Sequence, residues 1–381
     1  MNINSISSTI DRAFAAAGLN TRPTAIKVSE TIRKALAAAG IVQVAPPAAP
    51  PSPSTLSRLV DPAAHGLTWA PLARTQTVVD AGNLASDVQE DVGEFTSHSF
   101  SNGRAGRAYK LYVPSSYDGQ PMPLIVMLHG CKQNPDEFAL GTGMNELADS
   151  HGFLVAYPAQ TTRANGANCW NWFEASEQSR SGEEASVIAG IVREIRQTHC
   201  VDEGRVFVAG LSAGAAMAVI LGATYPDVFA AVGVHSGLPI GSARDVPSAF
   251  AAMRGSPAGP LNALRPGSHA TPSRGVPTII FHGDADITVH TSNGKEVAEK
   301  ATSAYASSGE FLREQALPRK SARGREFTTT RYLDSSGHAL VEHWVVHGAS
   351  HSWSGGNSGG SYTDPKGPNA SAEMVRFFLG Q

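Results

Sequence analysis

The chain has 381 residues, enough for one large catalytic domain and a smaller additional segment. Apolar residues make up 41% and charged residues 17%, which is typical of a globular protein. A net charge of −3 gives no clustered basic surface for nucleic acid, and no apolar stretch approaches the about 20 residues that cross a bilayer. We therefore expect neither a nucleic acid partner nor a membrane span.

Residues 1–43 contain a short internal repeat, in which segment 9–19 returns as segment 31–41. Each copy is rich in alanine, has one large apolar residue per turn, and ends at a glycine followed by an apolar residue. This pattern predicts two short amphipathic helices with glycine C-caps. Because two such helices bury little alone, we expect them to pack on the main domain, a partner or an apolar surface.

Residues 44–57 are rich in proline and alanine and predict an extended, semi-rigid linker. Residues 58–92 form a lead-in without an assignable pattern, and the catalytic domain is expected over 93–381. Within it we expect strands at 108–113, 124–128, 153–157, 206–209, 230–234, 278–282 and 340–346, and helices at 183–198, 213–225, 296–306 and 370–379.

Buried apolar strands that alternate with helices indicate an α/β fold. Its sheet should be mostly parallel and covered by helices on both faces, with the short N-terminal helical extension outside it. Ligand chemistry in such a fold belongs at the carboxyl ends of the strands.

Ser212 lies in a Gly-Leu-Ser-Ala-Gly sequence at residues 210–214, a match to the GxSxG motif. The motif alone is weak, because residues 356–360 match it too. Ser212, however, follows an expected strand and precedes an expected helix, as a nucleophile elbow requires. Ser358 lies in a Gly/Ser loop with no strand before it. We predict Ser212 as the nucleophile of an α/β-hydrolase fold.

The acid and the base of such a serine should follow later strands, in that order. Asp286 lies beyond the glycine turn after its strand, whereas Asp284 could brace the turn. His351 also lies beyond a glycine turn, whereas His347 is at the strand end and is expected to be structural. Asp286 and His351 therefore complete the predicted triad.

The oxyanion donors should be the N–H of Ala213 and an N–H from the turn after an early strand. His129, Gly130 and Cys131 form that turn, and Cys131 or a neighbour is the expected donor. Ser212 would attack an acyl carbon while His351 takes its proton and Asp286 holds the imidazole.

Three cysteines, Cys131, Cys169 and Cys200, include no CxxC pair, so neither a zinc site nor a cofactor is expected. The N-terminus shows no secretory signal, which predicts a cytoplasmic location and three reduced thiols. A Cys131–Cys169 disulfide that leaves Cys200 free is the alternative.

Six sequence blocks in one order resemble the polyhydroxybutyrate depolymerase-type esterases, which are related to feruloyl and acetylxylan esterases. The resemblance implies the triad of Ser212, Asp286 and His351 and places His129 in the oxyanion region. It extends over residues 93–381, and the blocks are residues 129–133, 156–160, 169–173, 210–215, 234–239 and 351–356.

The resemblance implies hydrolysis of short-chain hydroxyacid polyesters or their oligomers. A feruloyl or acetylxylan-type carboxylesterase is the alternative, and a non-catalytic granule-binding protein is an alternative of another class. The layout is similar to that of intracellular depolymerases, so the N-terminal helices could anchor the chain to a polyester granule. Secretion, as in many family members, is the alternative location.

Aromatic faces near an ester cleft can grip an acyl chain, although tryptophan also serves in packing. The candidates for substrate contact are Trp353, which we prefer, Trp170, Trp172 and Ser236.

Overall fold

The computed structural model describes residues 93–255, 275–321 and 324–381 of the chain. The expected N-terminal repeat, linker and lead-in therefore lie outside the described residues. Among the described helices, none combines the length and the hydropathy needed to cross a bilayer.

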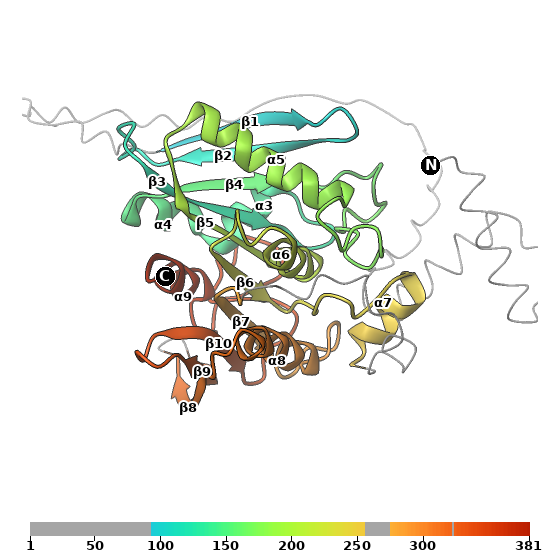
Figure 1. Ribbon diagram of the computed structural model, residues 1–381, viewed down its shortest axis with the longest axis vertical. Coiled ribbons are helices and arrows are strands. Elements are labelled where there is room, and N and C mark those ends of the chain that lie inside the picture. The colour runs from blue at the N-terminus through green and yellow to red at the C-terminus, as the bar shows by residue number, and fades with distance from the viewer. Residues whose placement is uncertain (1–92, 256–274, 322–323) are drawn as a thin grey trace, which may run out of the picture. The chain divides into compact units, whose positions relative to one another are not determined.

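A large mixed sheet organises the described part of the chain (Figure 1). Its strands are β1 (Glu94–Ser101), β2 (Gly106–Val113), β3 (Met122–Leu128), β4 (Leu154–Pro158), β5 (Val201–Leu211), β6 (Ala231–His235), β7 (Thr278–Gly283), β8 (Arg313–Lys320), β9 (Glu326–Leu333) and β10 (Ala339–Val346).

The strand order across the sheet is β1-β2-β4-β3-β5-β6-β7-β10-β9-β8. The central strands from β4 to β10 pair in parallel. At one edge β1 and β2 are antiparallel, and at the other β8 and β9 are. A second, small sheet pairs β11 (Trp353–Ser354) with β12 (Thr363–Asp364).

Helices cover both faces of this sheet (Figure 1). One core contains residues of α5 (Glu183–Thr198), α6 (Ala213–Thr224), α7 (Val246–Met253) and α8 (Ser292–Ser307). The other contains residues of α3 (Pro135–Thr142), α4 (Met144–His151) and α9 (Ala370–Leu379). The predicted α/β-hydrolase architecture, with a mostly parallel sheet between two helical layers, is confirmed.

Strand β5 shows why the sequence produces two cores. Its side chains alternate, so that Val206 and Val208 face one core while Phe207 and Ala209 face the other, and all four are buried. From Val206 on, β5 is therefore buried on both faces and apolar, as the parallel strands of such sheets are.

Some predicted bounds match the structure residue for residue, and other elements were missed. Helices α5 and α9 have the predicted bounds, whereas β5 begins at Val201, earlier than expected. Strand β8 is polar and exposed along most of its length, so it carries no alternating apolar pattern. Helices α3 and α4 are only eight residues each and meet at Gly143, which has a left-handed φ of 61°.

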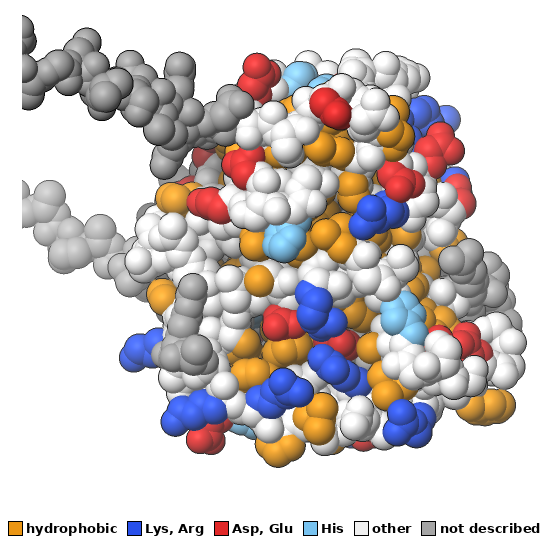
Figure 2. All heavy atoms as spheres, turned by 90° about the vertical axis from the view of Figure 1, so that its left-hand side faces the viewer, with side chains coloured by type: hydrophobic (Ala, Val, Ile, Leu, Met, Phe, Trp, Pro, Cys, Tyr) orange, Lys and Arg blue, Asp and Glu red, His pale blue; other side chains and the backbone are white. Residues whose placement is uncertain are grey.

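Figure 2 shows the side of the molecule that is on the left in Figure 1. Acidic side chains lie mainly in its upper half and basic ones in its lower half, with small apolar areas between them.

Candidate active site

Ser212 forms the sharp turn between β5 and α6. Its φ of 58° and ψ of −118° are in a region that L-residues rarely adopt. A Cβ at Gly214 would lie 2.1 Å from the carbonyl oxygen of Leu128, and one at Gly210 would lie 2.5 Å from the carbonyl carbon of Gly214. The two glycines of the motif are therefore required for the elbow to pack against the end of β3.

Asp286 and His351 form a hydrogen-bonded pair between the loops after β7 and β10. His351 Nδ1 lies 2.7 Å from Asp286 Oδ2, and the Asp286 side chain is fully buried. The other oxygen, Oδ1, accepts hydrogen bonds from the N–H groups of Thr288 and Val289, at 2.9 and 2.8 Å.

The electrostatics of this pair fix the tautomer of His351. Burial acts to raise the pKa of Asp286, but hydrogen bonds from His282 and His351 outweigh it and hold the pKa well below its usual value. An ionised carboxylate only accepts hydrogen bonds, so His351 Nδ1 must be the donor. Neutral His351 therefore presents an unprotonated Nε2, which is the atom a general base needs.

His282, at the end of β7, is a second histidine beside Asp286 that the sequence analysis missed. Its Nε2 lies 2.8 Å from the carbonyl oxygen of Val289 and 3.5 Å from Asp286 Oδ2. The ring is buried behind the carboxylate. A polar side chain at a strand end was its only sequence signal.

The competing residues of the two loops form a pair of their own. Asp284 Oδ2 lies 2.8 Å from His347 Nδ1, and Asp284 Oδ1 accepts from the N–H of Gly348 at 2.6 Å. Asp284 thus braces the turn and His347 is tied to it, both at partly exposed positions. Among the described residues, no group of three or more His, Cys, Asp or Glu side chains is arranged to hold a metal ion.

Neither Ser212 Oγ nor His351 Nε2 forms a hydrogen bond to a described residue. Ser212 follows β5 and His351 follows β10, on the carboxyl side of the parallel strands. Catalytic hydrogen bonds are often long without substrate and tighten in the complex, so this arrangement is compatible with proton transfer between the two side chains.

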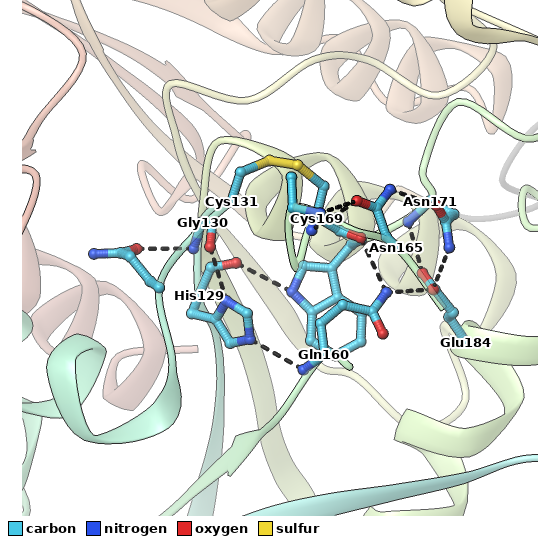
Figure 3. The surroundings of a disulfide bond; sticks show 11 residues. His129, Gly130, Cys131, Gln160, Asn165, Cys169, Asn171 and Glu184 are labelled. Carbon is cyan, nitrogen blue, oxygen red and sulfur yellow. Dashed lines mark hydrogen bonds between the residues drawn. A yellow bond between two sulfur atoms is a disulfide. The ribbon is translucent and has the colours of Figure 1, made fainter. Parts of the chain in front are cut away.

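The backbone donors of the turn after β3, whose residues His129, Gly130 and Cys131 are drawn in Figure 3, are not all hydrogen-bonded. The N–H of Gly130 donates to Gln133 Oε1 at 2.9 Å, that of Lys132 to the Ala167 carbonyl at 2.7 Å, and that of Gln133 to the Gly130 carbonyl at 3.2 Å. Within this described turn, the Cys131 N–H has no such partner. The geometry therefore selects Cys131 over Gly130 as the candidate oxyanion donor.

Ala213 is the candidate for the second donor. It is the first residue of α6, and its N–H makes no hydrogen bond within the described residues. The first N–H groups of a helix have no intrahelical acceptor, and the helix dipole favours negative charge near them.

His129 supports the turn rather than pointing a donor into the site (Figure 3). Its buried ring lies with Nδ1 2.8 Å from the Gly130 carbonyl oxygen, and its Nε2 accepts from the N–H of Gln160 at 3.1 Å. Burial lowers the pKa of His129, opposed by the contact with the Gly130 carbonyl. A neutral ring matches the acceptor role of Nε2.

Cys131 and Cys169 form a disulfide, and Cys200 is an exposed free thiol. The expectation of three reduced cysteines is therefore wrong, because two distant loops meet with the Cα atoms of this pair 4.2 Å apart. The bond joins the candidate donor to the loop that precedes α5, as Figure 3 shows.

A buried carboxylate holds that loop in place. Glu184 accepts hydrogen bonds from the backbone N–H of Asn171 and from its side-chain amide, both at 2.8 Å, and from the Gln160 side chain (Figure 3). Burial raises the pKa of Glu184, which hydrogen bonds from Asn171 and Gln160 partly offset.

The expected substrate contacts are buried residues. Trp170 is 0% and Trp353 1% exposed; their indole N–H groups donate to the His129 carbonyl and to Ser371 Oγ. Trp172 and Ser236 are also buried. The structure thus assigns the preferred Trp353, together with Trp170, to packing, and these side chains offer no surface to a substrate.

The chain matches a family profile described as Esterase PHB depolymerase over residues 107–326. The sheet, the elbow at Ser212 and the pair of Asp286 and His351 are together those of an α/β-hydrolase. The match spans more than half of the chain, so the protein belongs to this esterase family, and the resemblance seen in the sequence is confirmed.

Curated relatives carry depolymerase and esterase names. Poly(3-hydroxyalkanoate) depolymerase C of Paucimonas lemoignei is 34% identical over 245 residues, covering 63% of this chain and 57% of the relative. Poly(3-hydroxybutyrate) depolymerase of Ralstonia pickettii is 30% identical over 263 residues, covering 65% of this chain and 52% of the relative. Acetylxylan esterase A of Aspergillus oryzae is 30% identical over 200 residues, covering 50% of this chain and 64% of the relative. The chain spans about half to two thirds of these relatives.

Among solved structures, an acetyl xylan esterase from Aspergillus awamori superposes with a TM-score of 0.56 at 19% identity. The superposition covers 75% of this chain and 100% of that one. At this identity the likeness supports the fold.

Proposed function

We propose that the protein is a carboxylic ester hydrolase that cleaves short-chain hydroxyacid polyesters, of the poly(3-hydroxybutyrate) type, or their oligomers. The observation that carries the proposal is the hydrogen bond between His351 and the buried Asp286, at the same sheet edge as the Ser212 elbow. Membership of the depolymerase family and the names of two curated relatives support the polyester substrate.

In the proposed mechanism, Ser212 Oγ attacks the ester carbonyl carbon and transfers its proton to His351 Nε2. The N–H groups of Cys131 and Ala213 bind the oxyanion, and Asp286 stabilises the imidazolium. The alcohol leaves with the proton from His351. Water then attacks the acyl-enzyme with His351 as base, which releases the acid and restores Ser212.

Exposed apolar side chains favour an apolar polymer over a sugar-bound ester. Ile287, next to Asp286 in sequence, is 94% exposed. Among the described residues, five of the six exposed large apolar side chains lie in segments that follow β3, β6, β7 or β11 in the chain. These five are Leu140, Val246, Phe250, Ile287 and Tyr362; the sixth, Phe311, precedes β8.

A substrate panel tests the proposal. Wild type and Ser212→Ala are compared on native and denatured poly(3-hydroxybutyrate), hydroxybutyrate oligomers, methyl ferulate, acetylated xylan and p-nitrophenyl butyrate. We expect hydrolysis of polyester and oligomers by wild type and a loss of about 10⁶-fold in kcat for Ser212→Ala. Activity of the variant near the wild-type level would overturn the assignment of the nucleophile.

The second candidate, an acetylxylan or feruloyl esterase, is favoured by one observation, the 30% identity to a relative named acetylxylan esterase. Preference for methyl ferulate or acetylated xylan over the oligomers would select it. A non-catalytic granule-binding protein would bind polymer and hydrolyse none of the panel.

The Cys131–Cys169 disulfide favours secretion over the expected cytoplasmic location, because disulfides persist in oxidising compartments.

Residues 1–43 remain a proposed anchor to a polyester surface. Deleting residues 1–50 tests this second proposal: we expect less protein to pellet with polyester granules, and unchanged pelleting would contradict it.

A further inference from the structure

His235, the last residue of β6, contacts both halves of the proposed catalytic machinery. Its carbonyl oxygen accepts a hydrogen bond from the N–H of Ser212 at 2.9 Å. Its ring atom Nε2 accepts one from the N–H of Ser354 at 2.9 Å. Ser354 follows His351 by three residues, so one residue is bonded to the nucleophile elbow and to the loop of the base.

The His235 ring is held from both sides and is closed to solvent. It stacks between Phe281 and Trp353, with ring centroids 5.9 and 5.0 Å away. Its exposed fraction is 1%. A ring clamped in this way has one orientation, and its Nε2 can serve a single donor.

The hydrogen bond from Ser354 and the burial of the His235 ring also fix its protonation state. Because Nε2 accepts a hydrogen bond, the neutral ring carries its proton on Nδ1, which lies 3.2 Å from Ser236 Oγ. Burial first, and then the proximity of His282 and His351, lower the pKa of His235 to about 3. His235 thus stays neutral and keeps accepting from Ser354 while His351 gains and loses a proton.

We propose that His235 is a positioning residue that sets the approach of His351 to Ser212. The proposal rests on the proposed triad and goes beyond it. The backbone bond to Ser212 is available to any residue at this position, so the specific contribution of histidine is the acceptor at Nε2. Without it, the buried N–H of Ser354 has no partner, and the loop that carries His351 is free to shift away from the elbow.

Three substitutions separate the acceptor from the ring. His235→Phe keeps a flat ring between Phe281 and Trp353 but removes the acceptor. His235→Gln restores a strong amide acceptor, and His235→Met matches the length of glutamine with only a weak thioether acceptor. His343→Phe is the control, because His343 is another buried histidine of the sheet, whose Nε2 has no partner among the described residues.

The reactivity of Ser212 is measured with diethyl p-nitrophenyl phosphate, which phosphorylates an activated serine and releases p-nitrophenolate. Kinetics with p-nitrophenyl butyrate and thermal unfolding are recorded in parallel. Since a displacement of 1 Å can cost about 100-fold, we expect His235→Phe and His235→Met to lower the phosphorylation rate and kcat at least about tenfold, with KM within about twofold of wild type. His235→Gln and His343→Phe should stay within about threefold of wild type.

Wild-type reactivity in His235→Phe, or equal losses in the Gln and Met variants, would overturn the positioning role. If His235→Phe fails to fold, the comparison of Gln with Met decides. A wild-type protein that does not react at Ser212 would contradict the proposed function instead, so the two failures are distinguishable.

Discussion

Asp284 and His347 form a hydrogen-bonded pair that repeats the pair of Asp286 and His351. Asp284 precedes Asp286 by two residues in one loop, and His347 precedes His351 by four residues in the other. Two Asp–His pairs therefore bridge the same two loops. They differ in burial, because the Asp284 side chain is 38% exposed while that of Asp286 is 0% exposed. The outer pair fastens the loops together, and the inner pair has the geometry that orients the His351 ring.

The two aspartates should respond differently to the same substitution. Asp286→Asn should lower kcat by about 10³- to 10⁴-fold, because an amide neither fixes the His351 tautomer nor stabilises the imidazolium. Asp284→Asn should lower kcat less than about tenfold, since the exposed pair contributes about 1 kcal/mol or less to holding the loops. Steady-state kinetics with p-nitrophenyl butyrate check both, and equal losses would contradict the assignment of Asp286 as the acid.

The disulfide should influence catalysis as well as stability. In Cys169→Ser the Cys131 N–H loses its covalent support, so we expect kcat to fall about ten- to 100-fold with little change in KM. The free energy of unfolding should fall by about 2–4 kcal/mol. Cys200→Ser, which removes the exposed free thiol, is the matched control and should leave both quantities unchanged. A Cys169→Ser protein with normal kcat would show that the turn holds its donor without the bond.

His343 should make the fold sensitive to acid. Burial first, and then nearby His282 and Lys295, lower the pKa of His343 from 6.5 to about 4. Between these pH values the unfolded chain binds a proton that the folded protein does not, so stability is full above pH 6.5 and falls as the pH falls to about 4.

Replacing His343 removes this contribution. Urea unfolding of wild type and His343→Phe at pH 7.5 and pH 4 should show a loss on acidification that is about 3 kcal/mol smaller in the variant. The same acid-induced loss in both proteins would contradict a buried, neutral His343.

Ile287 should be required for work on solid polyester more than for ester chemistry. Its side chain is 94% exposed, so Ile287→Ser should change the free energy of unfolding by less than about 0.5 kcal/mol. We expect slower hydrolysis of a polyester film and unchanged kinetics with p-nitrophenyl butyrate. Phe311→Ser, at an equally apolar and 83% exposed position before β8, is the control. Equal effects of the two variants on the film would contradict a substrate-facing role for Ile287.

The central strands and most of the helices packed on them were predictable because their burial imposes a pattern. Strands β3 and β7 and the second half of β5, from Val206, are buried and largely apolar, and α5 repeats with helical spacing. Several of the elements that were missed bury less: β1 and β8 are largely exposed edge strands, and α7 buries only Ala249 and Ala252. Exposed elements impose few constraints on their sequence, so they carry little signal.

Ser212 and Asp286 could be proposed from the sequence as site residues because a turn motif marks each of them. His235 was missed because its partner Ser354 lies 119 residues away in the sequence. His282 was missed although Asp286 and Val289 are near it in the sequence, because only the fold of the loop after β7 brings the three together. The Cys131–Cys169 disulfide could be named only as the alternative, since its two cysteines are 38 residues apart in the sequence. Trp353 was misassigned because proximity in sequence to His351 says nothing about which way the ring points.

Strand β10 occupies an interior place in the sheet although it comes near the end of the chain. It pairs with β7 on one side and with β9 on the other, and β8 is joined to the sheet only through β9. A growing polypeptide that has not yet reached Val346 already carries Ser212, Asp286 and the disulfide cysteines, yet the hairpin of β8 and β9 has no strand to join. The strand that joins this hairpin to the sheet and the proposed base His351 therefore depend on the same late stretch of the chain, since His351 follows the last residue of β10 by five residues.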